Sequence, residues 1–119
     1  MKKVLAACFL ISLILICAVG AQADSSGSCG TNARWSYSNG VLTISGSGAM
    51  SNYTDGKQPW NSVATKVQTV QVEEGITSIG DYAFKGMSSL TSVQLPEGIK
   101  TIGKYAIQSC SALQEIVIP

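Results

Sequence analysis

Carboxylates are the side chains of this chain best suited to acid–base chemistry, because its 119 residues include no histidine. The lack of imidazole excludes histidine-based catalytic triads and HExxH zinc sites. Glu74 and Glu97 occupy matching places in two copies of a repeated segment. They would therefore lie about 5 Å apart on neighbouring coils, as the two carboxylates of a retaining glycosidase do. The repeat alone produces that alignment, and exposed turn residues explain it more simply. We predict that the chain is not an enzyme and has no catalytic residues.

The cysteines and glycines indicate no metal or cofactor chemistry. Cys8 and Cys17 fall in an apolar leader, which leaves Cys29 and Cys110 as a pair that a secreted chain could join in one disulfide. The repeat described below favours another role for Cys110, that of a small hydrophobic residue in the core. The "GSG" at 46–48 lacks the Gly-Lys-Ser/Thr that a phosphate-binding loop needs. We predict no cofactor and no metal.

The N-terminus has the features of a signal peptide. Lys2 and Lys3 precede an apolar run at 4–20, and the small residues "AQA" follow it as a cleavage pattern. The run is at the short limit for a membrane span, so we favour secretion over a retained anchor. The remainder is nearly balanced in charge, which argues against nucleic-acid binding and against a polybasic membrane surface. We expect a signal peptide over 1–23 and then one small domain, secreted, extracellular or on the cell surface.

The C-terminal part of the chain, residues 67–119, contains a sequence repeat. Residues 67–89, "VQTVQVEEGITSIGDYAFKGMSS", match residues 90–112, "LTSVQLPEGIKTIGKYAIQSCSA", at ten identical positions, and "LQEIVIP" begins a third copy. A 23-residue period with spaced aliphatic residues is typical of leucine-rich solenoids, whose coils bury their apolar side only by stacking. We predict an α/β, strand-rich leucine-rich repeat solenoid with parallel strands stacked every 23 residues.

Each copy should wind into a strand, a turn and a short helical segment. Val93 and Leu95 alternate with polar residues, so a strand would bury these two side chains. Gly98 can adopt a positive φ in the following turn. "KYAIQSC" is spaced for a single helical turn on the far side of the coil, and in the first copy Asp81 is placed to cap that turn.

Residues 24–66 do not repeat, and we expect them to cover the N-terminal end of the solenoid. "RWSYSNGVLTIS" predicts a β-hairpin with "NG" as its two-residue turn. "PWNSVATK" predicts a short helix with Pro59 at its first position. Trp35, Tyr53 and Trp60 could stack on sugars, but large aromatic side chains more often fill a core, and we favour that role.

The segment "LTSVQLPEGIKTIGKYAIQSC" fits the pattern L-x-x-[IV]-x-[LI]-P-x-G-[IVL]-x-x-I-G-x-x-A-F-x-x-C, with Ile107 where phenylalanine is usual. The first copy keeps Phe84 but has Glu73 for the proline and Met87 for the cysteine. The chain thus resembles the BspA-type leucine-rich repeat family, and "SCGTNARWSYSNGVLTISGSGAM…PW" resembles the cap that often precedes such repeats in secreted bacterial proteins. The resemblance covers about residues 28–119. It implies a secreted or cell-surface protein that binds host or neighbouring-cell components, adhesion among its roles.

We therefore predict a module that binds an extracellular protein or glycan, with no nucleic-acid partner and no membrane contact after signal cleavage. The alternative is a structural spacer or cap for a missing C-terminal domain, such as an anchor or a cell-wall or carbohydrate-active enzyme. The last strand would leave an open apolar edge, which should promote self-association. The alternation of polar and apolar residues along the strands would also arise on a sheet face that is exposed to solvent and binds no ligand. The expected binding residues face outward from the strands: Thr69, Gln71, Glu73, Ser92, Gln94 and Glu115.

Overall fold

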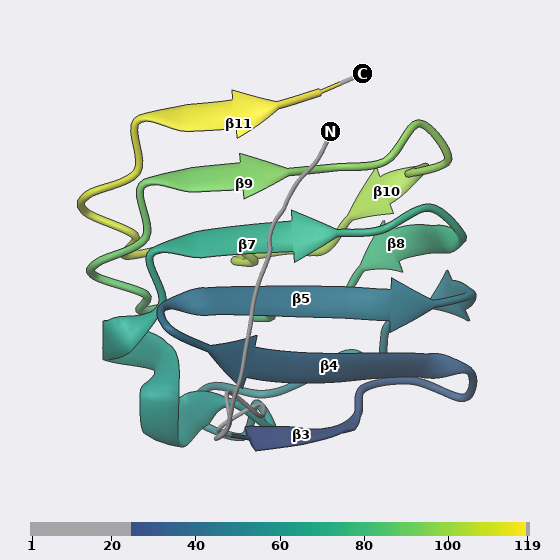
Figure 1. Ribbon diagram of the computed structural model, residues 1–119, viewed down its shortest axis with the longest axis horizontal. Helices are drawn as coiled ribbons and strands as arrows, with labels where there is room; N and C mark the ends of the chain where they lie inside the picture. Colours follow the sequence, from purple (N-terminus) through teal and green to yellow (C-terminus); the bar gives the residue numbers. More distant parts are fainter. Residues whose placement is uncertain (1–24, 119) are drawn as a thin grey trace, which may run out of the picture.

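A six-stranded sheet forms one side of the molecule in the computed structural model, which describes residues 25–118 (Figure 1). In spatial order its strands are β11 (Glu115–Val117), β9 (Ser92–Gln94), β7 (Thr69–Val72), β5 (Val41–Gly46), β4 (Ala33–Ser38) and β3 (Ser25–Ser28). Strands β11, β9, β7 and β5 run parallel, whereas β4 is antiparallel to both β5 and β3. The predicted strand-rich solenoid with parallel strands is confirmed. The predicted signal peptide, residues 1–23, lies outside the described residues.

The strand register follows the repeat. Val70 lies beside Val93, and Val93 beside Ile116, so neighbouring coils are related by the 23-residue period. Leu42 of β5 lies beside Val70, at a longer spacing of 28 residues. The segment before the repeats thus does more than cover the end of the solenoid, because its strand β5 occupies the place of a preceding coil in the same sheet.

A second, shorter sheet that we did not predict lies on the other side of the core (Figure 1). Its strands are β10 (Thr101–Ile102), β8 (Ile76–Ile79) and β6 (Gly48–Ala49), all paired in parallel. The first two coils and the segment before them therefore contribute one strand to the short sheet and at least one to the large sheet, and the apolar side chains of both sheets meet between them. Ile76 and Ile79 are 0% and 3% exposed, which places the middle of this core at the first repeat.

The far side of each coil is a series of turns, and the predicted helical turn is wrong. Residues 81–86 and 104–109 are turns, and Tyr82 and Tyr105 have positive φ angles of 61° and 59°. Such angles are incompatible with a right-handed helix. Successive backbone amides donate in two directions instead. The Ala83 amide donates to the Gly80 carbonyl within its own turn, whereas the Phe84 amide donates to the Ala106 carbonyl of the neighbouring coil.

Two predictions about single residues of the coils are wrong. Asp81 does not cap a helix, because its Oδ1 accepts the Lys104 amide of the next coil at 3.0 Å. Gly98 does not adopt a positive φ. At Gly80 the need for glycine is steric, since a Cβ would lie 1.8 Å from the Ser51 carbonyl oxygen. The coils pack so closely here that only a glycine fits.

The predicted hairpin is confirmed, and the predicted helix is shorter and of another type. The β4–β5 turn has φ angles of 50° at Asn39 and 81° at Gly40, as a two-residue hairpin requires. The helix is a 3-10 helix, η1 (Asn61–Lys66), which begins after Trp60. Pro59 therefore precedes the helix and is not its first residue.

Aromatic side chains fill the core beneath the hairpin, as predicted. Trp60 is 1% exposed and makes edge-to-face contacts with Trp35 and Tyr53, each at 5.7 Å between ring centroids. Its Nε1 donates to the Ala83 carbonyl at 2.7 Å, and the Tyr53 amide donates to the Asp81 carbonyl at 3.1 Å. These donors take the place of the amides that a preceding coil would supply.

Candidate binding face

Five of the six predicted binding residues lie in two rows across the parallel strands. Thr69, Ser92 and Glu115 are register partners on β7, β9 and β11, and they form the first row. Gln71 and Gln94 are register partners in the second row. All five are exposed or half-buried, while the alternate residues Val70 and Val93 are buried and Ile116 is half-buried. The alternation between inward and outward side chains therefore places these residues on one face of the sheet.

Glu73 lies at the edge of this face. It follows the last residue of β7, its side chain is exposed, and its amide donates to the Ile44 carbonyl at 2.9 Å. The main chain is thus still held against β5 at this point. Glu73 therefore borders the two rows without belonging to either.

The structure extends the second row over the cap, which we did not predict. The register joins Gln71 to Thr43 on β5, Thr43 to Ser36 on β4, and Ser36 to Ser26 on β3, while Gln94 is joined to Val117 on β11. The row therefore crosses all six strands. At about 4.8 Å per strand it spans about 24 Å. The alternation of polar and apolar residues in "VLTIS" predicted a strand of a hairpin, but it did not show that this strand would pair with the first strand of the repeats.

The chemistry of this face is that of neutral hydrogen bonding. Hydroxyl and amide groups dominate both rows, and Glu115 is the one ionised side chain within them. Hydroxyls and carboxamides each donate and accept hydrogen bonds. Such groups suit the polar surface of a protein or the hydroxyls of a glycan, whereas a polyanion would require a cluster of basic residues.

The groups with perturbed pKa values lie elsewhere. Burial raises the pKa of the Cys29 thiol to about 11, against a smaller opposing effect of the Arg34 charge. Burial also raises the pKa of Cys110, whose Sγ donates to the Phe84 carbonyl at 3.0 Å. Both thiols are free, so the structure does not contain the disulfide that their even number permits. Cys110 is half-buried at the place where the first copy has the fully buried Met87.

The two carboxylates with a possible catalytic arrangement are surface turn residues. Glu74 and Glu97 are both exposed, each in the turn after a strand of the large sheet. Within residues 25–118, no three acidic or cysteine side chains gather in a way that could hold a metal ion. The same part of the chain contains no helix long and apolar enough to cross a membrane.

Comparison with known proteins agrees with this architecture. Residues 62–119 match the family model described as BspA type leucine-rich repeat region. The chain is also similar to the crystal structure of a leucine-rich repeat protein from Eubacterium ventriosum, with 32% sequence identity and a TM-score of 0.71 over 78% of this chain. The similar region spans only 26% of that protein. A search of curated proteins finds no match.

Proposed function

Because residues 62–119 belong to the BspA-type leucine-rich repeat family, we propose that the chain is a recognition module of a secreted or cell-surface protein. Leucine-rich repeats are a general protein-binding fold, and this family is typically found on or outside bacterial cells. In this proposal the outward face of the six-stranded sheet binds an extracellular protein or glycan, as in adhesion, and has no catalytic role.

One observation supports this use of the face above others. The row from Ser26 to Val117 continues without interruption from the cap into the repeats, because the hairpin and the coils share one sheet. The two rows contain no aromatic side chain and one acidic residue, Glu115, while the exposed Arg34 of β4 and Glu73 lie beside them. A partner can therefore lie flat across the strands and meet polar groups at regular intervals.

The size of the face sets the expected strength of binding. An area of about 24 Å by 13 Å covers about 300 Å², well below the roughly 800 Å² per partner of a standard protein interface. We therefore expect weak, saturable binding that becomes tight only when several copies act together on one surface.

A binding assay with two matched variants tests the proposal. The purified full chain is applied to immobilised extracellular-matrix proteins and to a glycan array, beside the double variant Gln71→Arg/Gln94→Arg and the control Gln108→Arg. Gln108 is exposed on the turns of the far side, so the control adds the same kind of charge away from the face. We expect the double variant to abolish binding and the control to retain it.

Two results would count against the recognition role. Lack of saturable binding on every surface would favour the alternative, a structural spacer for another domain. Equal loss of binding in the double variant and the control would move the binding site away from the sheet.

A further inference from the structure

The outward face of the large sheet carries hydrogen-bonding groups at regular intervals in two directions. Across the strands, the second row joins the hydroxyls of Ser26, Ser36 and Thr43 to the carboxamides of Gln71 and Gln94. Successive positions in this row are about 4.8 Å apart, the spacing of neighbouring strands. Along a strand, outward side chains recur at every second residue, about 7 Å apart. We call this array of groups, which both donate and accept hydrogen bonds, the polar grid.

Further side chains flank the second row on both sides. The register adds Ser38 and Val41 to the first row. On the opposite side it forms a third row, whose members are Ser28, Arg34 and Ser45. All five are exposed or half-buried. The polar grid is therefore three rows deep where it crosses the cap, and four of these five additions carry a hydrogen-bonding group.

The charges at the border of the polar grid are balanced. Continuing the β5–β7 register by one residue places Glu73 beside Ser45, and Ser45 lies beside Arg34. A guanidinium and a carboxylate thus stand two strands apart, about 10 Å, at the end of the same row. The carboxylate would repel a polyanion, and the guanidinium would repel a polycation. The polar grid therefore favours a neutral partner.

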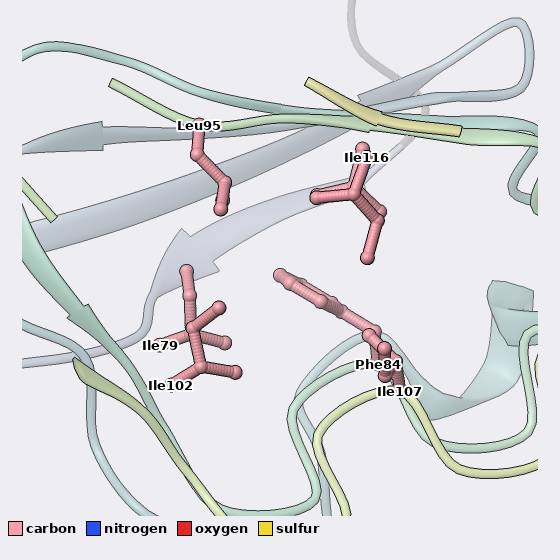
Figure 2. Close-up of a pocket in the computed structure, with 7 residues that line it drawn as sticks. Ile79, Phe84, Leu95, Ile102, Ile107 and Ile116 are labelled. Carbon is pink, nitrogen blue, oxygen red and sulfur yellow. The ribbon is translucent and has the colours of Figure 1, made fainter. Parts of the chain in front are cut away.

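Apolar side chains of the large sheet point to its inner side. Figure 2 shows Leu95 and Ile116 pointing from this sheet toward Phe84. Within residues 25–118, no aromatic side chain belongs to any of the three rows. Protein partners are usually held by a few buried aromatic or arginine anchors. The polar grid has one arginine and many small hydroxyls, so it suits a partner that makes similar hydrogen bonds at many positions.

We propose that the polar grid binds a neutral, linear polysaccharide of β-1,4-linked sugars that runs across the strands; this names the ligand class of the proposed recognition role and rests on it. Each sugar of such an extended chain advances by nearly the spacing of neighbouring strands, about 4.8 Å. One sugar can therefore meet one strand, and its hydroxyls can exchange hydrogen bonds with the hydroxyl or carboxamide of the second row. From β3 to β9 the second row has places for about five sugars.

The polysaccharide turns a hydroxyl edge, rather than the face of its rings, toward the sheet. Sugar hydroxyls project from the two edges of an extended chain, and the ring faces present mainly C–H groups. The ring faces would need aromatic side chains to stack on, whereas the edge needs donors and acceptors of the kind that the polar grid provides. An α-1,4-linked chain curls into a helix, so its successive hydroxyls turn away from a flat sheet.

A titration with matched oligosaccharides tests the proposal. β-1,4-linked pentaoses of glucose, mannose and N-acetylglucosamine are added to the isotope-labelled full chain up to about 5 mM, which detects dissociation constants of the order of 1 mM. The control is maltopentaose, which contains the same glucose units in α-1,4 linkage. We expect at least one β-linked pentaose to shift the side-chain amide NMR signals of Gln71 and Gln94 saturably. Maltopentaose should leave both signals unchanged.

Two matched substitutions locate the bound sugar. Thr43→Val removes the hydroxyl on β5, in the middle of the second row, and keeps the branched shape of the side chain. We expect it to weaken binding about fivefold, the effect of one lost hydrogen bond. Thr77→Val makes the same change on β8 of the short sheet, where the side chain is also half-buried, and should leave binding unchanged.

The results that would overturn this proposal differ from those that would overturn the recognition role. Lack of binding to every β-linked pentaose, equal binding of maltopentaose, or equal loss of binding in Thr43→Val and Thr77→Val would each refute the polysaccharide proposal. If the chain still bound an immobilised protein through Gln71 and Gln94, the recognition role would stand and only the ligand class would be wrong. If it bound neither sugar nor protein, both proposals would fail.

Discussion

Replacement of Trp60 by phenylalanine tests how the cap substitutes for a preceding coil. The indole nitrogen donates to the carbonyl of Ala83, and both residues are essentially buried, at 1% and 0% exposure. Trp60→Phe removes the donor and leaves a buried carbonyl without its partner, which costs about 1–3 kcal/mol. The smaller ring also leaves space among the aromatic side chains, which adds about 1 kcal/mol. We expect the free energy of unfolding to fall by roughly 2–4 kcal/mol.

The control is Trp35→Phe, which makes the same change of side chain in the same cluster. Trp35 is 8% exposed, lies 5.7 Å from Trp60 between ring centroids, and its indole makes no hydrogen bond with residues 25–118. It should therefore lose only the packing contribution, about 1 kcal/mol. Urea unfolding followed by far-ultraviolet circular dichroism measures both, since the backbone dominates that signal.

The difference between the two variants isolates the hydrogen bond. Equal losses of stability for Trp60→Phe and Trp35→Phe would refute the idea that the indole replaces a coil amide. A changed dependence on urea in one variant alone would show that the unfolded or folded state had changed in compactness, and the comparison would then use a thermal melt.

Three further predictions concern the contacts between coils and the buried titratable groups. Gly80→Ala should destabilise the folded chain by about 3 kcal/mol or more in a thermal melt, because its Cβ would lie 1.8 Å from a backbone oxygen. The control Gly86→Ala should cost only about 1 kcal/mol, because Gly86 has a positive φ but its Cβ would meet no atom within 4 Å. Asp81→Ala should cost about 1 kcal/mol in urea unfolding through the lost bond to the next coil, and Asp81→Asn should retain most of it. Burial raises the pKa of Cys29 from 9.0 to about 11 and that of Tyr53 from 10.0 to about 12, so the folded state holds these protons more tightly. Stability should be full below about pH 9 and fall as the pH rises through 11 to 12, and the double variant Cys29→Ala/Tyr53→Phe should flatten that fall.

The strands and the hairpin were predictable because their signals are local. Alternation around Val93 determines which side chains turn inward, and "NG" specifies a tight hairpin turn with positive φ at both residues. The 23-residue period then supplies the stacking, because equivalent residues must lie side by side. These signals need no knowledge of the neighbouring coil beyond its existence.

The far-side turns were not predictable because their conformation depends on the next coil. Both copies of this segment have apolar residues at helical spacing, yet in the first copy, "DYAFKGM", alternate amides donate outward to the next coil, which a helix would prevent. The role of Asp81 was missed for the same reason, since its hydrogen-bond partner is 23 residues away. The short second sheet also consists of segments of two to four residues, too brief to show a period.

The separation of the two sides of each coil explains how one repeat can be both stable and variable. The far side stacks through main-chain hydrogen bonds, a close glycine contact and buried aliphatic groups, so substitution there acts on folding. On the sheet side, Thr69, Ser92 and Glu115 are register partners with three different side chains, and their strands pair through main-chain atoms alone. Exposed substitutions in this row should therefore alter stability by no more than about 0.5 kcal/mol, and in the proposed recognition role they would change what the face binds. The repeat thus keeps the residues that stack its coils constant, and it varies the exposed residues of the sheet, which a partner could contact.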